Sequence, residues 1–101
     1  MLGFLFGKNI IKKALQNGAV VIDVRTPHEF DNGKVPGSVN IPVDRIAANI
    51  ARIKGMNNPI VLCCESGMRS STAKNILKTN GLKEVYNGRS WRSVLKIINK
   101  L

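Results

Sequence analysis

The sequence predicts an α/β domain with a mostly parallel central sheet of four to five strands and helices on both of its faces. Two short apolar runs, residues 20–24 and 60–63, are typical of buried parallel strands. Between and after them, apolar residues recur at helical spacing. Strands that alternate with helices favour a parallel sheet, because the crossover helices come to lie on its faces.

The chain has 101 residues, which is enough for one hydrophobic core without support from a metal or a disulfide. We expect an N-terminal apolar segment at residues 1–8 and a single domain at residues 9–101. The apolar stretch at residues 1–6 is too short for a membrane span or the core of a signal peptide. Packing of this stretch on the domain is the preferred interpretation.

In the first half, Asn9 is predicted to cap a helix over residues 10–16 that Gly18 ends, before the strand at residues 20–24. Residues 26–37 are rich in turn-forming residues, and His28, the only histidine of the chain, is expected there at the surface. A short strand is predicted at residues 39–41. A helix from Pro42 to Gly55 follows, and its predicted buried residues are Val43, Ile46, Ala47, Ile50 and Ile53.

In the second half, the central strand at residues 60–63 leads through a polar loop into a helix over residues 70–79, which ends at Asn80-Gly81. A strand at residues 84–86 and a turn at Asn87-Gly88 follow. Ser90 is predicted to cap the last helix. Its apolar face is predicted to present Trp91, Val94, Leu95, Ile98 and Leu101.

The loop after the central strand carries the chemistry, because Cys64, Gly67 and Arg69 lie within six residues of one another. A thiol between the end of a strand and the start of a helix faces free backbone N–H groups and the positive end of the helix dipole. Both stabilise a thiolate or a bound anion. Gly67 permits a tight curl of the backbone, and Arg69 adds a fixed cation.

Either of two adjacent cysteines could be the nucleophile. Counted from Cys63, the arginine spacing is that of tyrosine-type phosphatases, but those enzymes usually have a histidine where this chain has Leu62. Their glycine usually lies three residues after the cysteine, and only counting from Cys64 places Gly67 there. Cys64 is therefore the predicted nucleophile, with Cys63 as the last residue of the strand.

Residues 64–70, Cys-Glu-Ser-Gly-Met-Arg-Ser, resemble the active-site loop of the single-domain rhodanese family, the thiosulfate sulfurtransferases. Residues 21–30 and 33–42 resemble the strand-and-turn signature of that family, and residues 85–88 with Trp91 give a weaker third match. The family usually has one more strand before the first helix, for which this chain offers only residues 1–8.

The resemblance implies a rhodanese-like fold and a cysteine persulfide on Cys64, made from thiosulfate or a persulfide donor and passed to a thiophilic acceptor such as cyanide or a thiol. It implies no cofactor and no metal, and a protein sulfur donor or acceptor remains an option. The residues expected to bind substrate are Glu65, Ser66, Gly67, Met68 and Arg69. Those expected to give structural support are Asp23, Arg25 and Trp91, with Trp91 in the core or in a wall of the cleft.

The chain departs from the family pattern at three positions. Glu65 replaces a residue that is commonly basic, which opposes binding of an anionic donor and puts the preference for thiosulfate in question. Lys34 stands where the family more often has a histidine. Gly88 stands alone where a glycine pair is common, which concerns the edge of the cleft.

Two alternative functions stay open. A phosphatase or arsenate reductase on a related loop is the first, although the loop from Cys64 to Arg69 is one residue shorter than in the related cell-cycle phosphatases. Its smaller ring of N–H groups suits a single sulfur better than a tetrahedral oxyanion. A non-catalytic docking module is the second, against which the matched spacing of Cys64, Gly67 and Arg69 argues.

The chain is basic, with 16 Lys and Arg against 6 Asp and Glu and a net charge of +10. This charge fits a solubilising surface, steering of small anions, or docking on an acidic partner. Neither a nucleic-acid motif nor a strong membrane signal singles out one of these. Because the only two cysteines are adjacent, the sequence lacks a disulfide framework, which favours a reducing, cytoplasmic location.

Overall fold

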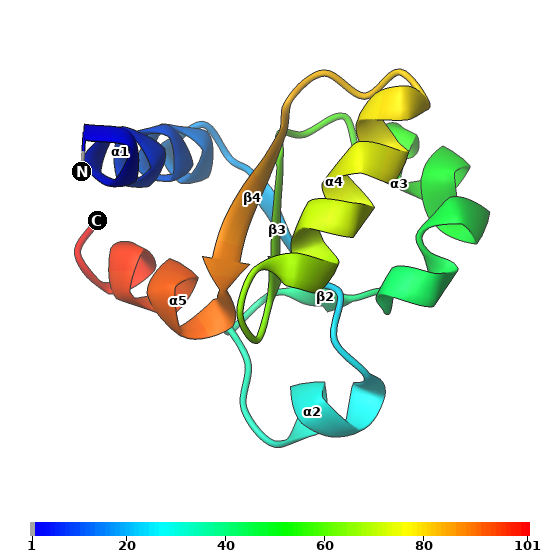
Figure 1. The fold of residues 1–101 in the computed structure, drawn as a ribbon, viewed down its shortest axis with the longest axis horizontal. Helices are drawn as coiled ribbons and strands as arrows, with labels where there is room; N and C mark the ends of the chain where they lie inside the picture. The colour runs from blue at the N-terminus through cyan, green and yellow to red at the C-terminus, as the bar shows by residue number, and fades with distance from the viewer. Residues whose placement is uncertain (1) are drawn as a thin grey trace.

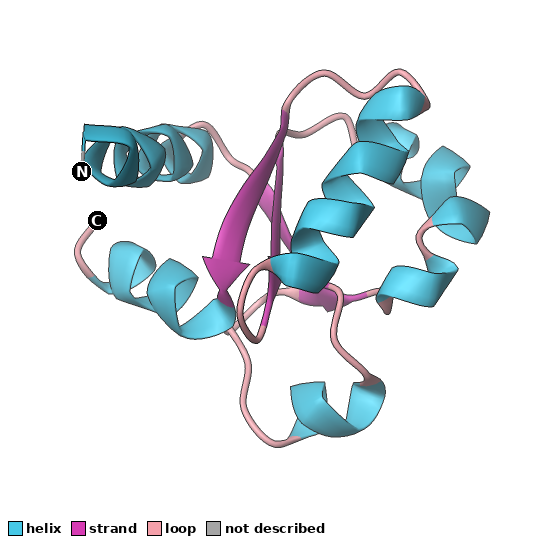
Figure 2. Ribbon diagram, in the orientation of Figure 1, coloured by secondary structure: helices cyan, strands magenta, loops and turns pink. Residues whose placement is uncertain are grey.

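The computed structural model describes residues 2–101, and the side chains from residue 7 onward. Helices and strands alternate along the chain (Figure 2). The elements are α1 (Leu2–Gln16), β1 (Val20–Asp23), α2 (Pro27–Asp31), β2 (Val39–Asn40), η1 (Val43–Arg45), η2 (Ala47–Asn49), α3 (Ile50–Gly55), β3 (Ile60–Cys64), α4 (Met68–Thr79), β4 (Val85–Ser90) and α5 (Trp91–Asn99).

The four strands form one all-parallel sheet in the order β2-β1-β3-β4 (Figure 1). This confirms the predicted α/β fold with four strands. The strand β3 lies between β1 and β4, so the residues that follow it emerge at the middle of the carboxyl edge of the sheet. Ligands of open parallel sheets bind at this edge.

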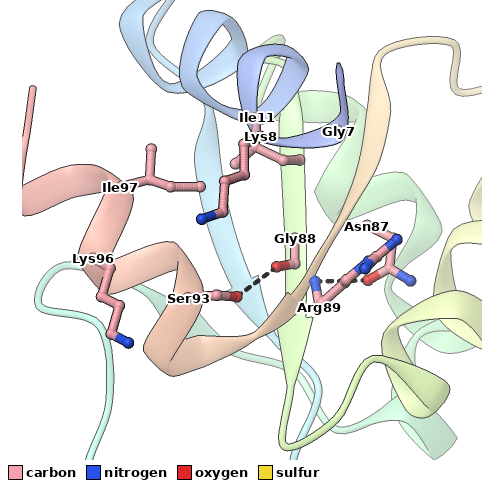
Figure 3. A pocket seen from close by; sticks show the side chains of 9 residues that line it. All are labelled: Gly7, Lys8, Ile11, Asn87, Gly88, Arg89, Ser93, Lys96 and Ile97. Atoms are coloured by element: carbon pink, nitrogen blue, oxygen red, sulfur yellow. Dashed lines mark hydrogen bonds between the residues drawn. The ribbon is translucent and has the colours of Figure 1, made fainter. Parts of the chain in front are cut away.

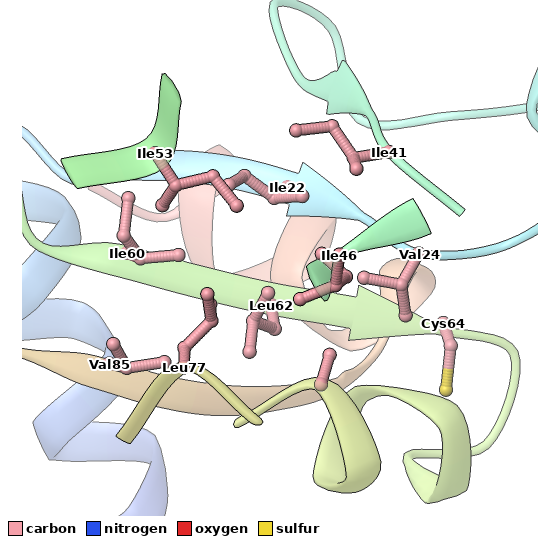
Figure 4. Close-up of a cluster of buried hydrophobic side chains, with 11 residues drawn as sticks. Ile22, Val24, Ile41, Ile46, Ile53, Ile60, Leu62, Cys64, Leu77 and Val85 are labelled. Carbon is pink, nitrogen blue, oxygen red and sulfur yellow. The ribbon is translucent and has the colours of Figure 1, made fainter. Parts of the chain in front are cut away.

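Side chains of β3 alternate between the two faces of the sheet, and each face has its own apolar cluster. Leu62 and Cys64 point to the face covered by α4 and by the segment from η1 to α3 (Figure 4). Val61 and Cys63 point to the face covered by α1 and α5. The alternation thus directs the two adjacent thiols to opposite layers of the molecule.

The first helix begins eight residues earlier than predicted, because α1 is continuous from Leu2 to Gln16. Asn9 lies inside it and does not cap it. Glycine or asparagine inside a helix costs only about 1 kcal/mol or less, and the burial of Ile11 and Ala14 against α5 offsets such a cost. Residues 2–16 therefore contain no strand. The predicted packing of residues 1–6 lies outside the described side chains, and the division at residue 8 stays a prediction.

The segment predicted as turns contains the short helix α2. Thr26 caps it and accepts a hydrogen bond from the N–H of Glu29, whose carboxylate in turn accepts one from the N–H of Thr26. With Pro27 in the first turn, this is a capping box that the sequence carries in Thr26-Pro27-His28-Glu29. His28 is exposed, as predicted.

The helix predicted from Pro42 to Gly55 is wrong as a single element, since η1, η2 and α3 share its residues. The side-chain amide of Asn49 donates to the carbonyl of Arg45 at 2.8 Å, a local bond that competes with regular helical pairing. Ile46 and Ile53 are buried as predicted, but Ala47 is exposed.

The turn predicted at Asn87-Gly88 is also wrong, because β4 continues to Ser90. The pairing with β3 shifts there: Leu62 is paired with Asn87, and Cys64 is paired with Ser90. One extra residue in β4 makes this a β-bulge, and Arg89 adopts a left-handed φ of 70° in it. A side chain at Gly88 would come within 2.6 Å of Val94, so only glycine lets α5 pack this closely.

The cap of the last helix is confirmed, since the hydroxyl of Ser90 accepts a hydrogen bond from the N–H of Ser93. Val94 is buried, but Leu101 lies beyond the end of α5 and is 55% exposed, in contrast to the prediction. The helices α1 and α5 lie side by side on one face of the sheet (Figure 1).

Candidate active site

The two thiols differ in their surroundings although they are neighbours in the chain. Cys63 is fully buried in the apolar cluster under α5, and this burial raises the pKa of its thiol far above the ordinary value. Cys64 points to the other face and sits at the beginning of the loop that leads into α4. Only Cys64 faces hydrogen-bond donors of that loop.

The Sγ atom of Cys64 accepts a hydrogen bond from the N–H of Gly67 at 3.0 Å and lies 3.4 Å from the hydroxyl oxygen of Ser70. Burial alone would raise the pKa of this thiol. The hydroxyl of Ser70 and the backbone N–H groups of Ser70, Gly67 and Ser66 lower it more strongly, and the net pKa of Cys64 lies below the ordinary value. The site therefore stabilises a thiolate.

The curl of the loop depends on Gly67, which caps α4 with a left-handed φ of 106°. A β-carbon at this position would be strained and would lie 3.4 Å from the Cα of Arg89 on β4. The predicted role of this glycine in turning the backbone is therefore present in the structure. It brings its own N–H under the sulfur, at the N-terminus of α4.

Arg69 extends toward α2 and forms two hydrogen bonds with the carboxylate of Glu29, at 2.6 and 2.9 Å. This pairing with Arg69 lowers the pKa of Glu29 to about 2. An anionic donor would therefore compete with Glu29 for the guanidinium of Arg69. The predicted donor-binding role of Arg69 stays a prediction.

Glu65 and Ser66 are exposed on the loop, and Met68, the first residue of α4, is exposed as well. The carboxylate of Glu65 is paired with Arg92 on α5 at 2.6 Å, and this hydrogen bond lowers the pKa of Glu65. Its negative charge is thus partly neutralised. Met68 is 79% exposed, an apolar surface directly beside the loop.

Asp23 and Arg25 form a fully buried ion pair behind the loop, with a shortest N–O distance of 2.6 Å. Arg25 also donates to the carbonyls of Gly33 and Glu29, at 2.7 and 3.3 Å. Through these bonds Arg25 holds α2 itself and the chain just after it, and Glu29 is also the residue whose carboxylate pairs with Arg69. The supporting role of Asp23 and Arg25 stays a prediction.

The indole ring of Trp91 lies 5.0 Å from the guanidinium carbon of Arg25 and 4.7 Å from that of Arg92. Its Nε1 is buried and makes no hydrogen bond to the described part of the chain. Trp91 thus lies between the buried ion pair and the Arg92 that holds Glu65. This location fits the predicted wall of a cleft as well as a core position.

Sequence analysis missed Ser70 and Asn87, which complete the surroundings of the sulfur. The hydroxyl of Ser70 donates to Oδ1 of Asn87 at 2.6 Å, and the amide of Asn87 donates to the carbonyl of Gly67 at 3.1 Å. Ser70 directly follows the arginine of the motif, which was a usable signal. Asn87 lies in the third resembling stretch, residues 85–88, but its contact with Ser70 could not be predicted, because a bulge that aims a side chain at the loop cannot be distinguished from a turn in one sequence.

A cavity of about 270 Å³ lies between α1, β4 and α5 (Figure 3). Arg89, Lys96 and Lys8 line it, and its lining contains no carboxylate. It adjoins the loop after β3, because Asn87 and Arg89 of its lining lie beside Gly67. This is one of the places where the basic character of the chain is concentrated.

Within residues 2–101, three or more metal-ligating side chains of the His, Cys, Asp or Glu type do not come together at any point. None of the helices described for this part of the chain is long and apolar enough to span a bilayer.

Comparison with known proteins identifies the family. The model of the rhodanese-like domain matches residues 8–89, which include the loop and the whole sheet up to the bulge. The chain belongs to the rhodanese-like domain family. This confirms the resemblance drawn from the three sequence stretches.

The rhodanese-like chain is 38% identical over 69 residues to the uncharacterized protein YqhL of Bacillus subtilis, covering 68% of this chain and 54% of that protein. It thus spans about half the length of this curated relative. It is 35% identical over 75 residues to the thiosulfate sulfurtransferase GlpE of Stutzerimonas stutzeri, covering 73% and 68% of the two chains.

Among solved structures, a rhodanese with anions from E. coli superimposes with a TM-score of 0.69 and 30% identity, over 75% of this chain and 91% of that one. The human single-domain sulfurtransferase TSTD1 superimposes with a TM-score of 0.68 and 25% identity, over 85% and 89%. Relatives of the rhodanese-like domain thus include thiosulfate sulfurtransferases.

Proposed function

We propose that this rhodanese-like domain is a sulfurtransferase that carries a sulfane sulfur as a persulfide on Cys64. The donor is thiosulfate or another persulfide, and the acceptor is a thiophile such as cyanide or a thiol. One observation carries the proposal: the Sγ of Cys64 accepts the N–H of Gly67 at the start of α4, in a setting that lowers the pKa of the thiol. Relatives with thiosulfate sulfurtransferase activity in their names support it.

In the first half-reaction the Cys64 thiolate attacks the outer sulfur of thiosulfate. A sulfur–sulfur bond forms to Cys64, the sulfur–sulfur bond of thiosulfate breaks, and sulfite leaves with the electron pair. In the second half-reaction the acceptor attacks the outer sulfur of the persulfide. The Cys64–sulfur bond breaks, and Cys64 leaves as a thiolate. The loop N–H groups stabilise the negative sulfur of Cys64 both before the first half-reaction and after the second.

Cys64 has no exposed surface in this conformation, so a donor can reach Sγ only when neighbouring groups shift. Gly67 and the exposed loop residues beside it are the segment whose movement would open the sulfur. The short loop presents a small ring of N–H groups, which suits one added sulfur better than a phosphoryl group with three peripheral oxygens to stabilise. This difference favours sulfur transfer over phosphate-ester hydrolysis.

The test is the intact mass of the protein after incubation with thiosulfate. The unchanged protein and a Cys63→Ala variant should gain about 32 Da, one sulfur atom, and lose it on addition of cyanide. Cys64→Ser should gain nothing. Cys63→Ala is the matched control, because it removes the other thiol from the opposite face of the same strand.

Three outcomes would overturn the proposal. An adduct that forms on Cys64→Ser but not on Cys63→Ala would show that Cys63, and not Cys64, carries the sulfur. Hydrolysis of an aryl phosphate without any sulfur adduct would favour the phosphatase alternative. A folded protein with neither activity would favour the docking module.

A further inference from the structure

Asn87 is connected to the active-site sulfur through Ser70, and this connection rests on the proposed function of Cys64. The hydroxyl oxygen of Ser70 lies 3.4 Å from Sγ of Cys64 and 2.6 Å from Oδ1 of Asn87. Ser70 is buried, so these two neighbours rather than water compete for its hydrogen bonds. Asn87 comes from β4, and Ser70 from the first turn of α4.

The hydroxyl of Ser70 has a single proton to donate. In the structure this proton is donated to Oδ1 of Asn87 at 2.6 Å. The lone pairs of Ser70 can then accept the S–H of a neutral Cys64 thiol. A Cys64 thiolate has no proton and can only accept. To stabilise it, Ser70 must turn its proton to the sulfur and give up the bond to Asn87.

Loss of the bond to Ser70 would not displace Asn87, because two other hydrogen bonds hold its carboxamide. Its Oδ1 also accepts the N–H of Arg89 at 2.9 Å, and its amide donates to the carbonyl of Gly67 at 3.1 Å. The bulge in β4 fixes these contacts, so the carboxamide stays in place while the proton of Ser70 turns. Asn87 is therefore a permanent second acceptor beside the sulfur.

We propose that Asn87 and the sulfur of Cys64 compete for the single proton of Ser70, and that Asn87 thereby positions this proton during sulfur transfer. Asn87 holds the proton while Cys64 is a thiol or the two-coordinate inner sulfur of a persulfide. When an acceptor takes the outer sulfur, the electron pair of the broken bond returns to Cys64. Ser70 then turns its hydroxyl to this sulfur and stabilises the leaving thiolate, while the proton stays bonded to oxygen.

The charged groups around the sulfur do not position the proton of Ser70. Arg69 of α4 is paired with Glu29 of α2, and Arg25, just after β1, is paired with Asp23. Arg89 of β4 lies beside Gly67 and donates its backbone N–H to Asn87. Cys63 faces the opposite layer and has a raised pKa. Asn87 is neutral, so its effect on the sulfur must pass through Ser70 or through the position of the loop.

The experiment separates these two routes with a double-mutant cycle in the Cys63→Ala background. The four proteins carry Ser70 and Asn87 unchanged, Ser70→Ala, Asn87→Ala, and both substitutions. The pKa of Cys64 is measured from the pH dependence of alkylation by iodoacetamide, and discharge of the persulfide to cyanide is measured in a single turnover. Ser70→Thr, which keeps a hydroxyl, is the conservative control.

We expect Ser70→Ala to raise the pKa of Cys64 by about half to one unit and to slow discharge several-fold, because a donor to the thiolate is lost. Asn87→Ala should lower the pKa by a smaller amount, because Ser70 then donates to the sulfur alone. In the Ser70→Ala background, Asn87→Ala should change nothing further. Ser70→Thr should resemble the unchanged protein.

Competition is refuted if Asn87→Ala leaves the pKa of Cys64 unchanged or raises it to the same extent with and without Ser70. A rise in both backgrounds would mean that Asn87 only holds Gly67 in place. If Asn87→Ala does not fold, Asn87→Asp replaces it. Its carboxylate retains the proton more firmly, so the pKa of Cys64 should rise more with Ser70 than without it, and equal rises would refute the proposal.

The alkylation cycle requires no sulfur donor, so it tests the proton arrangement even if Cys64 carries no sulfur in the mass measurement. A protein in which Ser70 and Asn87 are coupled as predicted, but which gains no sulfur, would refute the proposed function alone. A protein that gains sulfur but shows no coupling between Ser70 and Asn87 would refute the further inference alone.

Discussion

The sulfur of Cys64 is subject to opposing effects within a few ångströms. Burial disfavours its thiolate, while the N–H of Gly67 and the hydroxyl of Ser70 favour it, and the donors prevail. One residue earlier, Cys63 has the same thiol, but burial raises its pKa instead. The pKa of a cysteine thiol in this chain thus depends on which face of β3 it occupies.

At the residue scale, Glu65 offers a test of local charge. Its carboxylate is exposed and paired with Arg92, so Glu65→Gln removes a negative charge beside the loop and also releases a guanidinium there. We expect the KM for thiosulfate to fall about two- to threefold at low ionic strength, and the change to shrink with added salt. Steady-state kinetics with cyanide as the acceptor would measure it.

Glu84→Gln is the matched control for Glu65, because Glu84 precedes β4 at the opposite end of the sheet from the loop. It changes the net charge equally. An equal fall in KM for both variants would mean that the net charge of the chain matters and that the position of Glu65 does not.

At the scale of elements, the ion pair of Glu29 and Arg69 joins α2 to α4 across 40 residues of sequence. The carboxylate of Glu29 also closes the capping box of α2. Helix α2 is only five residues long and buries none of its side chains, so these polar contacts and the bonds from Arg25 hold it in place. The position of α2 beside the site therefore depends more on charged groups than the packing of the apolar core does.

Glu29→Gln tests this contact, since glutamine can still close the capping box but cannot form the ion pair. The pKa of Glu29 is lowered from 4.5 to about 2, so its pairing stabilises the folded state fully above about pH 4.5 and is lost as the pH falls toward 2. We expect Glu29→Gln to unfold at lower urea concentration at pH 7. The difference from the unchanged protein should shrink below pH 4.5.

Asp31→Asn, which removes an exposed carboxylate from the same short helix, is the control for that measurement. It should lower the urea midpoint less than Glu29→Gln does at pH 7. If the difference between Glu29→Gln and the unchanged protein stayed constant from pH 7 to pH 2.5, the ion pair would not contribute to stability.

At the scale of the whole molecule, the net charge of +10 distinguishes this chain. In the part of the chain that the structure describes, three of its six carboxylates form ion pairs with Arg25, Arg69 and Arg92, and the excess of cations over carboxylates shapes the surrounding field. The cavity lined by Arg89 and Lys96 adjoins the loop. A field of this sign draws small anions to the surface and weakens with salt.

Steering by this field can be measured with two alkylating agents of similar size, using the Cys63→Ala protein. Iodoacetate is an anion and iodoacetamide is neutral, so the ratio of their rates on Cys64 cancels any effect of salt on the thiol. We expect the ratio to fall several-fold between about 20 mM and 500 mM sodium chloride. A constant ratio would show that the charge serves some purpose other than attracting anions to Cys64.

Local physical chemistry in the sequence predicted the parallel α/β fold and the loop, and the resemblance of three stretches indicated the family. The spacing to Gly67 favoured Cys64 over Cys63, and its role as nucleophile stays a prediction. Apolar runs, helical spacing and the interval from Cys64 to Gly67 are short-range patterns that can be read from a single sequence. The capping box of α2 was equally local, in Thr26 and Glu29, and could have been found.

Tertiary structure alone decided what surrounds the sulfur. Arg69 was available to an anion by sequence, but Glu29, 40 residues away, holds it. Asn87-Gly88 has the composition of a turn, yet pairing with β3 and the packing of Val94 on Gly88 keep it extended as a bulge. That bulge aims Asn87 at Ser70, because hydrogen bonds between distant segments, rather than local propensity, fix the direction of a side chain at the edge of a sheet.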